Sequence, residues 1–119
     1  MYNLVKIGEE TVPMLAMASI DVYYRNIFHE DPVKRESELP GAAEAVEFYT
    51  RMAFVMAKFA ELKSRDGMKT LTEDDFLDWL DQYDRMDMAN ALVDVQKTYN
   101  GQSVTHSDAK KNNDEPSEK

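Results

Sequence analysis

The chain has 119 residues, no cysteine and a formal net charge of -9. It can build one hydrophobic core, but it has neither a disulfide framework nor a thiolate metal site. The negative charge disfavours nucleic acid or an anionic membrane as a partner, because both would repel it. No apolar run reaches the roughly 18 residues of a membrane span, and the first residues lack the basic-then-apolar order of a signal peptide. We therefore expect a cytoplasmic protein, with no nucleic acid and no membrane among its partners.

The N-terminal segment predicts a β-hairpin. Two short β-prone runs within residues 2–15 flank the sequence Gly8-Glu9-Glu10, a pattern that is typical of a hairpin. Pro13 then has to lie at an edge or a strand end, because it has no amide hydrogen to donate. A lone hairpin is marginally stable in water, so we expect it to pack on the helices or to pair with another subunit.

A helical pattern follows the hairpin. From Ser19, which we expect to be the N-cap, apolar residues recur at helical spacing as far as Phe28. We expect this helix to end by Glu30, because the next residue precedes Pro32 and is disfavoured in the α region. Residues 31–39 are charged and aperiodic, so a loop is predicted there.

The longest predicted element is a helix from Pro40 to Arg65, with Pro40 in its first turn, where the missing amide hydrogen has no cost. Its charged residues fall on one narrow stripe, and apolar residues cover the rest of the surface. Phe54 lies in the middle of the charged stripe. It therefore needs cover, either from the hairpin of its own chain or from another protein.

Two further helices are predicted. Thr72 with Asp75 three residues on is an acidic variant of the capping box, and it marks the start of the first of these helices. A turn at Asp66-Gly67 precedes it. After a break near residues 84–87, a last helix ends at Asn100-Gly101.

These elements predict a mainly α fold with four helices around one long central helix and a short N-terminal β-hairpin. We expect a single domain of residues 1–101. Residues 102–119 contain one aliphatic residue and no aromatic one. Such a composition cannot offset the entropy of ordering, so we expect a disordered polar tail.

The sequence contains no recognisable catalytic or metal-binding pattern. His29 and His106 are the only imidazoles, too few for a catalytic triad or a zinc site. Residues 71–94 carry eight acids against Arg85 alone, but they lack the glycine of an EF-hand loop. We therefore expect no enzyme activity, no cofactor and no metal. The acidic segment is interpreted as a solvated helix face, with a docking site for a basic partner as the alternative.

Three ordered segments carry a resemblance. The first segment comprises residues 12–14, VPM, and residues 24–31, YRNIFHED. The second is residues 52–58, MAFVMAK, and the third is residues 76–80, FLDWL. In this order and at these separations they resemble the motifs of tail assembly chaperones from long-tailed, siphovirus-type phages of Gram-positive bacteria. The similarity covers residues 5–100 approximately. His29 departs from the pattern, since a glycine is common at this position in the family.

The resemblance implies a non-enzymatic chaperone in virion morphogenesis. It would bind the tape measure protein, a long helical client, keep it soluble, and help to recruit the major tail protein through a longer, frameshifted form. Residues 109–112 read AKKN, which an A-rich slippery run would encode. The implied location is the cytoplasm of the infected bacterial host and not the finished virion. We also expect a homo-oligomer, because uncovered apolar surface and a hairpin edge favour self-association.

A chaperone for a helical client needs apolar grooves that receive anchors at i, i+3 and i+4. Our candidate partner-binding residues are Phe54, Tyr24, Arg25, Phe28, Asp31, Trp79 and Leu80. Arg25 and Asp31 have an alternative role, an ion pair that holds the corner after the first helix. The competing hypothesis for the whole protein is an acidic helical adaptor or inhibitor, which binds a basic host protein through residues 73–87.

Overall fold

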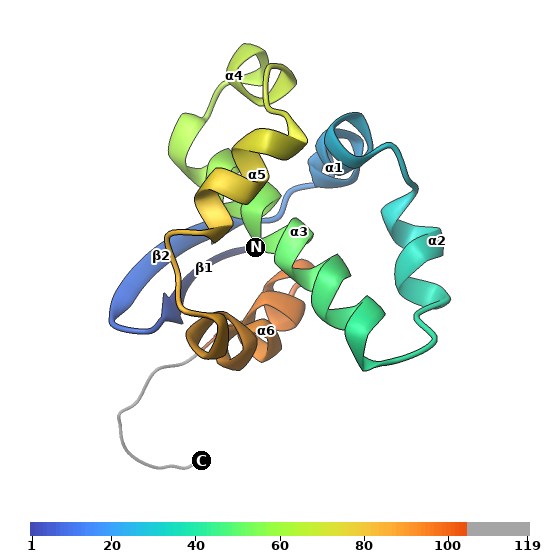
Figure 1. Cartoon of the computed structure of the whole chain (residues 1–119). Helices are drawn as coiled ribbons and strands as arrows, with labels where there is room; N and C mark the ends of the chain where they lie inside the picture. Colours follow the sequence, from blue (N-terminus) through green and yellow to red (C-terminus); the bar gives the residue numbers. More distant parts are fainter. Residues whose placement is uncertain (105–119) are drawn as a thin grey trace.

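The computed structural model describes residues 1–104, which form a two-stranded sheet and six helices (Figure 1). The elements are β1 (Tyr2–Ile7), β2 (Glu10–Leu15), α1 (Ile20–Phe28), α2 (Pro32–Ser37), α3 (Ala42–Leu62), α4 (Arg65–Lys69), α5 (Glu73–Leu80) and α6 (Arg85–Tyr99). The predicted mainly α class and N-terminal hairpin are confirmed, although there are six helices where four were expected. The predicted disordered tail began at residue 102, but residues 102–104 are ordered against β1: the Asn3 side-chain amide donates to the Gln102 carbonyl at 2.9 Å, and the Val104 amide donates to the Asn3 side-chain oxygen at 3.3 Å. The rest of the predicted tail, including the AKKN segment, lies outside the described residues.

The hairpin packs on the helices through one face. Its strands pair antiparallel, with Val5 opposite Val12, and Gly8 in the turn has φ 65°, a conformation that glycine adopts without steric cost. Alternate side chains of a strand share a face, and the face toward the core consists of Val5, Ile7, Val12 and Met14. Strand β2 contacts α3 and strand β1 contacts α6. The predicted packing of the hairpin on the helices is therefore confirmed.

The chain after α1 forms a short helix where a loop was predicted. The Asp31 carboxylate accepts hydrogen bonds from the amides of the second and third residues of α2, and Pro32 occupies the first helical position, where proline is tolerated. The loop prediction was wrong because an aspartate N-cap followed by proline begins a helix even without apolar periodicity. Ser19 lies at the N-cap of α1, but its side chain makes no capping hydrogen bond.

Helix α3 lies at the centre of the core. It spans Ala42–Leu62, so Pro40 precedes the helix and is not in its first turn. The left-handed conformation of Lys63, with φ 52°, ends the helix before the expected Arg65. Helix α3 contacts β2 and each of the five other helices. Every residue from Phe48 to Ala57 except Arg51 is buried, so the middle of α3 is where the other elements converge.

The second half of the fold follows its predicted caps. The Thr72 hydroxyl accepts a hydrogen bond from the Asp75 amide at 3.2 Å, and the Asp75 carboxylate accepts one from the Thr72 amide at 2.9 Å, so the capping box is confirmed. The Asp84 carboxylate caps α6, which ends at Asn100 and Gly101 as predicted. The expected turn at residues 66–67 is instead part of the short helix α4. None of the helices within residues 1–104 has the length and apolar character needed to cross a membrane.

Candidate partner-binding site

Phe54 is fully buried within its own chain. The centroid of its ring lies 5.6 Å from that of Phe76 and 5.7 Å from that of Trp79, both on α5. The charged stripe of α3 is interrupted at this turn because α5 packs there and brings these two rings over Phe54. Phe54 therefore belongs to the core and presents no surface to a partner. This corrects the expectation of a partner contact, since the cover comes from α5.

Tyr24 and Phe28 also belong to the core. Both are buried, and their ring centroids lie 5.0 Å apart. The Phe28 ring lies 5.3 Å from Phe76 of α5 in an edge-to-face arrangement, a geometry that aromatic pairs favour. The apolar face of α1 is therefore covered by the rest of the fold, and the expected contact between this face and a client is corrected.

Arg25 and Asp31 are exposed, but they do not form the ion pair that we considered. Asp31 caps α2, and within residues 1–104 no ion pair joins it to Arg25. Neither residue lines one of the two hollows described below. The corner after α1 is held by other residues.

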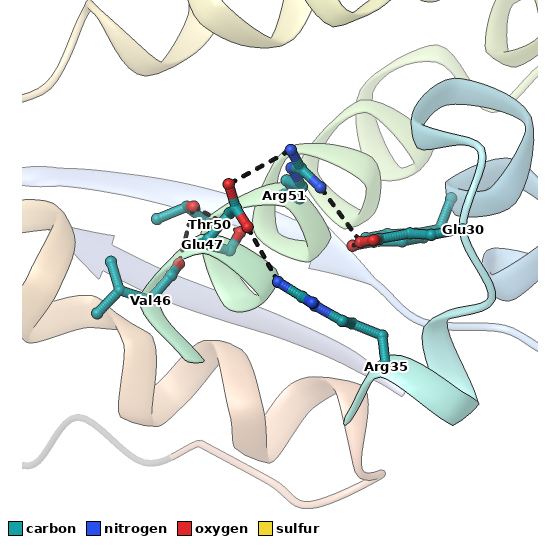
Figure 2. A network of polar contacts seen from close by, with 7 residues as sticks. Glu30, Arg35, Val46, Glu47, Thr50 and Arg51 are labelled. Atoms are coloured by element: carbon teal, nitrogen blue, oxygen red, sulfur yellow. Dashed lines mark hydrogen bonds and ion pairs between the residues drawn. The ribbon is translucent and has the colours of Figure 1, made fainter. Parts of the chain in front are cut away.

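A polar network that sequence analysis missed joins α1 and α2 to α3 (Figure 2). The Arg51 guanidinium donates to Glu30 at 3.2 Å and to Glu47 at 3.5 Å, and Arg35 of α2 donates to Glu47 at 3.0 Å. The Arg51 guanidinium also lies 5.0 Å from the centroid of the Phe28 ring, within the range of a cation–π contact. The (i, i+4) spacing of Glu47 and Arg51 was visible in the sequence, whereas their partners, Glu30 after α1 and Arg35 on α2, were not.

The surroundings of Tyr24 and Arg51 shift the pKa values of both groups. Burial, followed by the carboxylate of Glu30, raises the pKa of the Tyr24 phenol, which donates a hydrogen bond to that carboxylate. Burial by itself would lower the pKa of the Arg51 guanidinium, but Glu47 and the other nearby acceptors outweigh it and raise the pKa. The network therefore has a neutral phenol and a charged guanidinium at neutral pH. Its role is to fasten α1 and α2 to α3.

An apolar groove of about 380 Å³ lies where α3, α5 and α6 meet, and we name it the α3/α5/α6 groove. Its apolar wall includes Val46, Leu80 and Met88. Thr50 also lines the groove, and its hydroxyl donates to the carbonyl oxygens of Val46 and Glu47 at 2.9 Å (Figure 2). Val46 is 46% exposed, so an apolar side chain is accessible at the rim. Of the residues predicted to bind a partner, Leu80 lies in this groove.

A second hollow of about 410 Å³ lies between β2, the C-terminal half of α3 and the end of α5, and we name it the aromatic cleft. It is lined in part by Trp79 and Tyr83, whose ring centroids are 5.2 Å apart in an edge-to-face arrangement. Tyr83 also lines the α3/α5/α6 groove. Trp79 and the adjacent Leu80 line different hollows, so two neighbouring hollows lie at the C-terminal end of α5.

The acidic segment contributes to the fold as well as to the surface charge. Asp75 and Asp84 cap helices, and a Cβ added at Gly8 would lie 2.6 Å from a carboxylate oxygen of Asp87, so the hairpin turn closely approaches the start of α6. Within residues 1–104, no group of three or more His, Asp or Glu side chains is arranged to hold a metal ion.

The structure divides the seven predicted partner-binding residues into three groups. Tyr24, Phe28 and Phe54 lie in the core, and Arg25 and Asp31 are exposed outside both hollows. The two α5 residues line the hollows, although Trp79 is 6% exposed and belongs to the core as well. No family model, no curated protein and no solved structure matches the chain.

Proposed function

We propose that the chain is a tail assembly chaperone of a long-tailed phage, which binds the tape measure protein in the cytoplasm of the infected host and keeps it soluble. The observation that carries the proposal is the α3/α5/α6 groove. It combines an apolar wall with an accessible rim, and its Leu80 belongs to the FLDWL segment that carries part of the resemblance.

The groove suits a helical client. An amphipathic helix binds a hydrophobic groove through residues at i, i+3, i+4 and i+7, which lie on one face. The groove has walls from three helices, so an apolar anchor that enters it can contact Val46, Leu80 and Met88 together. A tape measure protein is a long helix and offers many such anchors. Weak binding at repeated sites would keep a client soluble without holding it irreversibly.

The backbone at His29 gives independent support to the resemblance. His29 has φ 59° and ψ 37°, in the left-handed region that glycine adopts without a steric penalty. A glycine is common at this position in the family. The same backbone turn therefore accounts for the family's glycine and accommodates the histidine of this chain at some cost in strain.

Three finer points belong to the same proposal. We propose that α3 is the central support for the three other long helices, α1, α5 and α6. We propose that the chain forms a homo-oligomer, because no further strand within residues 1–104 pairs with the edges of the two-stranded sheet. Recruitment of the major tail protein would require a longer, frameshifted form of the chain.

Co-expression with the tape measure protein of the same phage tests the proposal. The soluble fraction of the client is measured with the wild-type chain, with Val46→Lys and with Val22→Lys. Val46 and Val22 are 46% and 45% exposed, and both lie on helices, but only Val46 lines the groove. Val46→Lys should lower the soluble client strongly because it places a charge in the apolar wall.

The control variant Val22→Lys should behave like the wild type, since it adds the same charge outside the groove. If the wild-type chain leaves the client insoluble, the proposed function is wrong. If the two variants reduce client solubility equally, the groove is not the client-binding site.

A further inference from the structure

The aromatic cleft differs chemically from the apolar groove beside it. Two rings and two carboxylates line it: Trp79 and Tyr83 from the end of α5 and the segment after it, Glu10 at the start of β2, and Glu61 near the end of α3. These residues are far apart in the sequence and are brought together because β2 and α5 both pack on α3.

The carboxylates leave the cleft with surplus negative charge. Lys58 also lines the cleft, and its ammonium lies 3.3 Å from Glu61, so that pair is neutral overall. Glu10 has no basic ion-pair partner within residues 1–104. Burial, followed by the charge of Glu10, raises the pKa of the Tyr83 phenol, so the phenol stays neutral and the negative charge in the cleft is that of the carboxylate.

This combination is selective for a cation. The face of an aromatic ring attracts an ammonium or a guanidinium through its quadrupole, and a carboxylate adds a charge-assisted hydrogen bond. A guanidinium fits best, because its plane can stack on the half-buried Tyr83 ring while its edge donates to a carboxylate. Trp79 is 6% exposed and offers little surface of its own. The segment that contributes Trp79 and Tyr83 is itself acidic, since residues 71–94 carry eight acids and Arg85 as the single base.

We propose that the aromatic cleft binds an arginine side chain of the client, next to the apolar anchor that occupies the α3/α5/α6 groove. The inference rests on the proposed function for the identity of the partner. Tyr83 lines both hollows, so one client helix can reach both. The chaperone would thus recognise helical segments in which an arginine lies close to an apolar residue, and it would discriminate against purely apolar helices.

The test uses a probe in place of the client. Nα-acetyl-arginine amide is titrated into the full chain at millimolar concentrations, and the emission of Trp79, the single tryptophan of the chain, is recorded. The matched probe is the citrulline compound, which has nearly the same shape without the charge. We expect a saturating change in emission with the arginine compound and none with the citrulline compound. An equal response to both probes would overturn the proposal, and this comparison needs no protein variant.

A pair of variants then tests the assigned carboxylate. Glu10→Gln should weaken binding of the arginine probe about threefold, the effect expected for a partly solvated ion pair. Glu9→Gln removes the same charge from the hairpin turn, outside the cleft, and should leave the binding unchanged. Equal weakening by the two variants would show a general charge effect and overturn the assignment of Glu10.

The outcomes separate this inference from the proposed function. If the chain keeps the client soluble but does not distinguish the two probes, only the proposed binding of arginine in the aromatic cleft is overturned. Selective binding of the arginine probe by a chain that fails to solubilise the client overturns the proposed function, while the recognition of arginine by the cleft stands.

Discussion

Replacing Phe54 with alanine should destabilise the fold, because the structure assigns this residue to the core. The ring is fully buried and packs on Phe76 and Trp79. A buried phenylalanine removes about 150 Å² or more from water, and at about 25 cal/mol per Å² this corresponds to about 4 kcal/mol. The alanine retains a small part of this area, whereas the cavity and the two lost ring pairs add to the cost. We expect the free energy of unfolding to fall by about 3–5 kcal/mol.

Urea unfolding, followed by far-UV circular dichroism and by the emission of Trp79, measures this change. The control is Leu77→Ala on α5, because Leu77 is 50% exposed and its truncation should cost less than about 1 kcal/mol. A folded Phe54→Ala protein with nearly wild-type stability and impaired client solubilisation would refute the reasoning. Phe54 would then be a contact residue, as the charged stripe of α3 first suggested.

Three further predictions concern the backbone and one buried phenol. His29→Gly should raise the free energy of unfolding by about 0.5–1 kcal/mol in urea titrations, since glycine removes the left-handed strain at φ 59°. Gly8→Ala should destabilise the fold more than Gly101→Ala, because both have positive φ but only Gly8 would place a Cβ 2.6 Å from the Asp87 carboxylate. The fold raises the pKa of Tyr24, so the unfolded chain releases this proton first, and stability should fall as pH rises above about 10. In Tyr24→Phe the free energy of unfolding should fall less steeply with pH, by the contribution of one proton.

Each of these predictions has an outcome that would contradict it. A loss of stability in His29→Gly would mean that the imidazole makes a contact worth more than the backbone strain. Equal destabilisation by the two glycine variants would mean that the close approach of Asp87 to Gly8 does not affect the stability of the fold. For Tyr24, urea titrations at several alkaline pH values give the slope, and a slope unchanged by the phenylalanine variant would show that Tyr24 titrates alike in both states.

Much of the secondary structure was predictable because its signals are local. The hairpin is encoded by strand-forming runs around Gly8, and α5 by its capping box, and both depend on residues a few positions apart. The segment after Asp31 was not predicted correctly from these local signals. Its N-cap and proline are helix-start signals, but the absence of apolar periodicity favoured a loop.

The binding residues were predicted less well than the fold. Helical periodicity places Phe54 among charged residues, and it contains no information about which element will cover that face. Trp79 and Leu80 line the two hollows, and their contact with a partner stays a prediction. The position of Glu10 beside Trp79 in the aromatic cleft could not be anticipated, because the two residues lie nearly seventy positions apart in the chain.

The sequence by itself determined the helical class, the hairpin, the start of α5, the end of α6 and the acidic character of the chain, because these depend on composition and on neighbours within one or two turns. Only the tertiary structure decided that α5 covers Phe54 and that two different hollows lie beside the end of α5. It also decided that Arg51 bonds to Glu30 after α1 and that Arg35 of α2 bonds to Glu47 of α3. The physical reason is that burial and pairing depend on which elements meet in space. The packing of α5 and β2 on α3 therefore made an expected contact residue part of the core and left the hollows beside it as the candidate binding surface.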